Sequence, residues 1–109
     1  METVLSHHGV PIRLTAERWM HIVENHDDLA GMMYETLEVV AEPDIIARGK
    51  NGELLAIQTQ RKPALVVVYR ERSRSDGFII TAFRTSKPEH LIKTRRVVWQ
   101  AQESKKHSA

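Results

Sequence analysis

The sequence predicts an α+β fold in which two N-terminal helices pack on a four-stranded antiparallel sheet. Two observations lead to this fold class. Between Thr15 and Pro43 the apolar residues recur at helical spacing, whereas from Ile45 to Phe83 they gather in short runs rich in β-branched residues. The short turns between those runs indicate a meander. The chain after Pro88 is compatible with a C-terminal helix or with an added strand around residues 97–99.

Both helices have recognisable ends. Thr15 is a typical N-cap residue, and Leu14 with Trp19 fits a hydrophobic staple at the start of the first helix. The second helix is predicted to begin after Asp28 and to end before Pro43. The helices therefore precede the whole sheet in the chain.

Four strands are predicted after the helices. They cover residues 45–48, 53–60, 64–69 and 78–83. Asn51-Gly52 is the strongest hairpin signal, and Asp76-Gly77 ends the charged turn between the last two strands. The sequence therefore predicts an antiparallel order for all four.

Length and composition favour one domain. The chain has 109 residues, of which 41% are hydrophobic and 28% are charged, as in ordinary globular proteins. We expect a flexible leader at residues 1–9, one domain at residues 10–100 and a polar tail at residues 101–109. The absence of cysteine excludes thiol enzymes and disulfide scaffolds. With no membrane-spanning apolar run, we expect a cytoplasmic protein without a membrane partner.

The charge is distributed unevenly along the chain. Residues 1–60 contain 4 basic and 10 acidic residues, a net charge of −6, whereas residues 61–109 contain 12 basic and 4 acidic residues, a net charge of +8. A basic half of this size attracts polyanions such as RNA. The alternative interpretation is a solvated basic face, or one that pairs with the acidic half of the same chain.

Four segments resemble a known family. They are Arg13–His26, Glu42–Ile46, Leu65–Val68 and Ile79–Phe83, with Lys87 beyond them. Over residues 12–88 the chain resembles the phage-associated branch of the barnase, EndoU, colicin and RelE-like ribonuclease superfamily. The resemblance implies a metal-independent endoribonuclease, toxin-like or phage-encoded, without a cofactor. It also implies an antitoxin or immunity protein as a partner.

The chemistry implied by this resemblance is attack of the RNA 2′-hydroxyl on the adjacent phosphate. Proton transfer suits histidine, which titrates close to neutral pH. The candidate catalytic residues are His21, His26 and Thr81, the threonine hydroxyl holding the scissile phosphate. For each there is a structural alternative: an exposed helix residue for His21, a packed residue for His26 and an ordinary strand residue for Thr81. Helical spacing places His21 and His26 about 140° apart, which does not support a zinc site.

Four cations near the strand ends are candidates for binding RNA phosphates. They are Arg61, Arg70, Arg84 and Lys87. Each is alternatively a charge that keeps a strand edge from aggregating. The sequence offers no obvious glutamate–histidine pair on the sheet.

The remaining function hypotheses are a non-catalytic RNA- or DNA-binding module and a protein-interaction domain with a basic face. The oligomeric state stays open.

Overall fold

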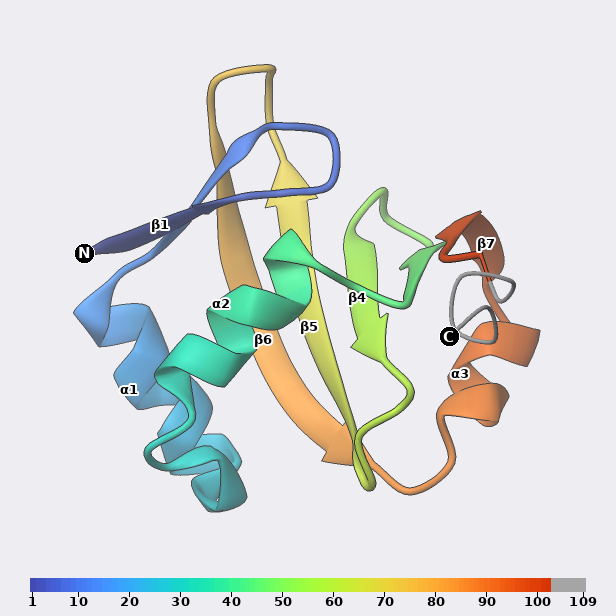
Figure 1. Cartoon of the computed structure of the whole chain (residues 1–109). Helices are drawn as coiled ribbons and strands as arrows, with labels where there is room; N and C mark the ends of the chain where they lie inside the picture. Colours follow the sequence, from blue (N-terminus) through green and yellow to red (C-terminus); the bar gives the residue numbers. More distant parts are fainter. Residues whose placement is uncertain (103–109) are drawn as a thin grey trace.

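The structure is a computed structural model, and it describes residues 1–102. It contains three helices and a seven-stranded mixed sheet (Figure 1). The strands are β1 (Glu2–Leu5), β2 (Pro11–Leu14), β3 (Ile45–Arg48), β4 (Leu54–Gln58), β5 (Ala64–Glu71), β6 (Gly77–Thr85) and β7 (Arg96–Gln100). The helices are α1 (Ala16–Asn25), α2 (Met33–Ala41) and α3 (Pro88–Lys93), with a 3₁₀ turn, η1, at Asp27–Leu29.

The prediction of a four-stranded antiparallel sheet is wrong. The strand order is β1-β2-β6-β5-β4-β3-β7, and β2 runs parallel to β6. The four predicted strands form the centre, and β1, β2 and β7 extend the sheet on both sides. These added strands are only four or five residues long. β2 and β7 join the sheet through β6 and β3, which lie far away in the chain, so the local hydrophobic pattern does not identify the added strands.

The segment expected to be a flexible leader forms an edge strand and a turn. β1 pairs with β2 through a hairpin, and Gly9 at its turn has a φ of 81°, which favours glycine. Residues 88–100 combine both predicted alternatives, because α3 is followed by β7. Of the predicted polar tail, residues 103–109 lie outside the described residues.

The main core lies between the sheet and the two N-terminal helices. Thr15 caps α1 as predicted, accepting a hydrogen bond of 3.1 Å from the backbone N–H of Arg18. Ile22 of α1 and Val39 and Val40 of α2 are buried against this face of the sheet. The second helix starts later than predicted, because Asp27–Leu29 form η1 instead.

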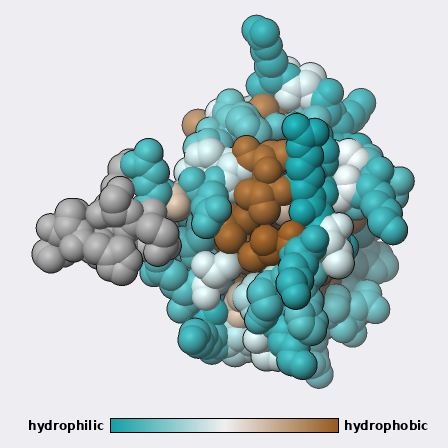
Figure 2. Space-filling model, turned by 90° about the vertical axis from the view of Figure 1, so that its right-hand side faces the viewer, coloured by the Kyte–Doolittle hydropathy of each residue, from teal (hydrophilic) through white to brown (hydrophobic). Residues whose placement is uncertain are grey.

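The opposite face of the sheet is covered only in part. A second apolar cluster lies there, formed by Ile45, Ala47, Leu55, Ile57 and Val66. Leu91 and Ile92 of α3 pack against it. From the side on which α3 and β7 lie, an apolar strip remains visible between hydrophilic side chains (Figure 2). Within residues 1–102 no helix has the length and apolar character needed to cross a membrane.

The short pairing of β2 with β6 determines where α1 lies relative to the sheet. Only two residue pairs join these strands, Ile12 with Gly77 and Arg13 with Phe78. The chain then turns into α1, while β6 continues to Thr85 without a described strand partner on that side. This divergence places the polar side of α1 beside the first residues of β6.

Candidate functional site

Two adjoining cavities lie along the start of α1, with volumes of about 260 and 150 Å³. They share Thr15 and Arg18. The larger is lined by Thr15, Glu17, Arg18, His21 and Asn25, and the smaller by Arg13, Thr15, Arg18, Phe78 and Ile79. We refer to these eight residues as the α1 groove. Most of them belong to the Arg13–His26 segment that carries the family resemblance.

Helix geometry explains why these side chains share a surface. Arg18, His21 and Asn25 follow the i, i+3, i+7 spacing of one helix side. Ile22, between them in sequence, is buried in the core and fixes the rotation of α1. Thr15 and Arg13 precede the helix and reach the same surface from its N-terminal end. The polar stripe is therefore a consequence of where the apolar stripe is buried.

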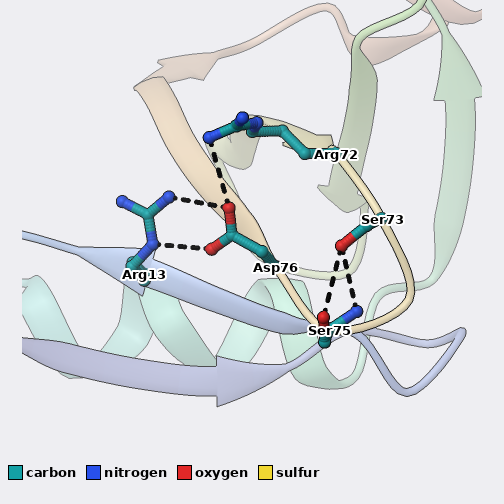
Figure 3. Close-up of polar contacts among 5 residues, drawn as sticks. All are labelled: Arg13, Arg72, Ser73, Ser75 and Asp76. Atoms are coloured by element: carbon teal, nitrogen blue, oxygen red, sulfur yellow. Dashed lines mark hydrogen bonds and ion pairs between the residues drawn. The ribbon is translucent and has the colours of Figure 1, made fainter.

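An ion-pair network holds the β2 side of the groove. Arg13 donates to both oxygens of Asp76, at 2.8 Å from Nε and 3.0 Å from Nη2, and Arg72 lies 3.5 Å from Oδ2 (Figure 3). The hydrogen bond from Arg13 lowers the pKa of Asp76, and the same bond raises the pKa of Arg13. Arg13 therefore fastens the β5–β6 hairpin to β2 and remains a cation at the edge of the groove.

The other groove cation is free to bind an anion. Within residues 1–102, no carboxylate lies at ion-pair distance from the Arg18 guanidinium, and its side chain is exposed. His21 is also exposed, and its Nδ1 lies 3.7 Å from a carboxylate oxygen of Glu24. That contact leaves Nε2 as the ring nitrogen for proton transfer. Arg18 and His21 thus present a fork of donors and an imidazole on one helix side.

His26 and Arg84 lie at a different place, near η1 and the far end of β6. His26 follows the last residue of α1, and its ring centroid lies 6.3 Å from that of Phe83. Arg84 is 3.9 Å from Asp28, and its buried Nε has no hydrogen-bond partner among the described residues. The structure therefore separates His21 from His26, as their helical spacing predicts.

Thr81 lies on the opposite face of the sheet from Arg84. It pairs with Val68 of β5 and is half-buried. Alternation along β6 gives Thr81 the same orientation as Phe83, which packs against the second apolar cluster. The three predicted catalytic residues consequently occupy three separate surroundings.

The remaining predicted phosphate-binding residues are also dispersed. Arg61 lines a cavity of about 520 Å³ between the β4–β5 turn and the start of α3, and its Nε donates to Oε1 of Gln58 at 2.8 Å. Lys87 is exposed just before α3. Arg70 donates to the backbone carbonyl of Asn51 at 2.9 Å, which ties β5 to the β3–β4 hairpin. Arg61 and Lys87 lie at one end of the sheet, since Ser86 and Pro88 line the Arg61 cavity, whereas Arg70 lies near the other end.

The structure contains a glutamate–histidine pair that the sequence did not reveal. Nδ1 of His8 lies 3.1 Å from both carboxylate oxygens of Glu71, and Ser6 Oγ donates to the same carboxylate at 2.6 Å. Glu71 lies 63 residues after His8, so no local spacing could predict the pair. The only local signal is Gly9, whose positive φ closes the turn that carries His8.

Among residues 1–102, no group of three or more His, Cys, Asp or Glu side chains is arranged to hold a metal ion. The chain matches no protein-family model, no curated protein and no solved structure. The resemblance to the ribonuclease superfamily therefore remains an expectation.

Proposed function

We propose that this protein is a metal-independent endoribonuclease and that the α1 groove binds the scissile phosphate. The observation that carries the proposal is the convergence in one groove of a histidine, a helix-capping hydroxyl and an arginine that has no ion pair within residues 1–102. The arginine can bind the anion, the histidine can transfer a proton, and the hydroxyl can position the phosphate. The basic C-terminal half of the chain supports RNA as the polyanion.

The groove residues divide the reaction among them. Nε2 of His21 accepts the proton of the 2′-hydroxyl, the 2′-oxygen bonds to phosphorus, and the bond from phosphorus to the 5′-oxygen breaks. The departing 5′-oxygen takes a proton from the imidazolium or from water. Arg18 stabilises the charge that develops on the phosphoryl oxygens. Thr15 Oγ already accepts the Arg18 N–H, which leaves its own hydrogen to donate to the phosphate.

The other predicted residues have roles outside the groove in this proposal. Arg61, Arg70 and Lys87 contact distant phosphates of the RNA. His26, with Arg84 near it, and Thr81, on the opposite face of the sheet from Arg84, are separate alternative candidates for the catalytic centre. The cytosol is the proposed compartment. An antitoxin or immunity protein is the proposed partner, because an active ribonuclease harms the cell that makes it. A non-catalytic nucleic-acid-binding module and a protein-interaction domain are the alternative functions.

Single substitutions test the groove directly. The substrate is a labelled single-stranded RNA in the presence of EDTA, and initial cleavage rates are compared among variants. We expect His21→Ala to lower the rate about 100-fold or more, the usual effect of losing a general acid or base. Arg18→Ala should lower it by a similar factor because a charged donor to the phosphoryl group is lost.

Matched controls distinguish the groove from its alternatives. His90→Ala and Arg74→Ala remove an exposed histidine and an exposed arginine elsewhere, and they should leave the rate within about twofold. A large loss in His26→Ala with normal activity in His21→Ala would move the catalytic centre to the far end of β6. RNA that stays intact but shifts in a salt-sensitive gel would favour the binding module.

A further inference from the structure

A second surface, at the corner where the β1–β2 turn meets β7, combines an aromatic stack with two arginines that form no ion pair among the described residues. The His7 ring lies 4.1 Å from the Trp99 ring, with 36° between their planes. Trp99 also packs against the main core, so the stack rests on a fixed support. His7 is exposed, which leaves the outer side of this aromatic pair open to solvent.

The turn that carries His7 is anchored by the glutamate–histidine pair. Ser6 and His8 both bind Glu71, whose side chain is only 17% exposed, whereas that of His8 is 48% exposed. The ring centroids of His7 and His8 are 5.4 Å apart. A carboxylate at the end of β5 therefore holds the turn in place and keeps His7 over Trp99.

Two arginines lie opposite each other on neighbouring strands beside this stack. Arg48 of β3 lies directly opposite Arg96 of β7, and both side chains are exposed. Like charges in directly opposite positions destabilise a sheet. Neither guanidinium forms an ion pair with a carboxylate within the described part of the chain. An anion bound between them would relieve the repulsion.

Strand register brings the arginines and the stack together. Trp99 is opposite Ile46, and Arg48 is two residues further along β3. The register shifts between Ile46 and Ala47, where β7 has one extra residue, Val98, so Arg96 is still opposite Arg48. Side chains two residues apart point to the same face, about 7 Å from each other. The arginine pair and the aromatic pair are thus neighbours on the helix-covered side of the sheet.

We infer that this corner is a binding site for one nucleotide of a single-stranded nucleic acid. The base stacks on His7 over Trp99, and its phosphate binds Arg48 and Arg96. Only an unpaired base exposes the flat surface that such a stack requires, so a duplex is excluded. The inference does not depend on cleavage in the α1 groove, because stacking and phosphate binding need no reacting hydroxyl.

Tryptophan fluorescence tests the site. The chain has two tryptophans, Trp19 and Trp99, so Trp19→Phe leaves Trp99 as the only reporter. The probe is a ten-nucleotide oligodeoxyuridine, which lacks the 2′-hydroxyl and cannot be cleaved through it. We expect saturable quenching of Trp99. In the same background His7→Ala should weaken binding about tenfold, the value of one stacked base.

A second comparison, between two double variants, tests the role of the arginine pair. The double variant Arg48→Ala/Arg96→Ala should weaken binding of the oligonucleotide at least tenfold. The slope of log K against log[salt] should become shallower by about 0.7 for each phosphate contact that is lost. The control Lys62→Ala/Lys93→Ala removes the same charge from exposed positions elsewhere. Urea unfolding verifies that each variant is folded. An equal loss in both double variants, unquenched Trp99, or equal affinity for a duplex of the same length would overturn the inference. Oligonucleotide binding with no RNA cleavage would refute only the proposed function.

Discussion

Single residues in this protein act mainly through charge pairs that cross between distant segments. Arg13 and Asp76 are the best example, because their forked hydrogen bond joins β2 to the β5–β6 hairpin over a separation of 63 residues. Neither residue was singled out from the sequence as half of a pair. By contrast, the arrangement of residues on one helix can be predicted from sequence: Arg18, His21 and Asn25 share one side of α1 because of their spacing.

The Asp76 pair predicts a pH dependence of stability. The folded-state pKa of Asp76 is lowered, so its stabilising contribution is complete above the unfolded-state pKa of about 4 and is lost as the pH falls through the lower folded value. Urea unfolding between pH 7 and pH 2 should therefore show Asp76→Asn less stable than wild type at neutral pH, with the difference vanishing in acid. In an Arg13→Gln background most of the effect of Asp76→Asn should disappear. An undiminished effect there would contradict the pairing.

At the scale of elements, local patterns predict helices better than they predict sheet edges. The Thr15 cap and the buried Ile22 follow from nearby sequence, and so do the four central strands. β2 and β7 join the sheet through partners dozens of residues away, and no periodicity in four or five residues specifies such a partner. The His8–Glu71 pair was missed for the same reason, since it depends on where the β1–β2 turn lies after folding.

Gly77 is critical to the pairing of β2 with β6. A Cβ at this position would lie 2.5 Å from the Arg70 carbonyl oxygen and 2.6 Å from Cδ1 of Ile12. We expect Gly77→Ala to destabilise the fold by about 1–3 kcal/mol in urea unfolding, because backbone and core must both shift. Gly49→Ala is the matched control, since its new Cβ meets only the movable carboxylate of Glu53. Equal effects of the two substitutions would show that the close approach at Gly77 is unimportant.

The whole molecule has polar or cationic sites at both ends of β6 and at the β7 edge. The α1 groove lies where β2 leaves β6, and the nucleotide site proposed above lies where the β1–β2 turn meets β7. The two proposals together assign cleavage of a single-stranded RNA to the α1 groove and the binding of another of its nucleotides to the corner at β7.

The terminal groups of the RNA fragments show whether the α1 groove catalyses attack of the RNA 2′-hydroxyl on the adjacent phosphate. Wild-type protein is incubated with a labelled single-stranded RNA in EDTA, and the terminal groups of the fragments are identified. We expect 2′,3′-cyclic phosphates on one fragment and 5′-hydroxyls on the other, and neither product with His21→Ala. Intact RNA, or fragments with 3′-hydroxyl and 5′-phosphate ends, would contradict this mechanism.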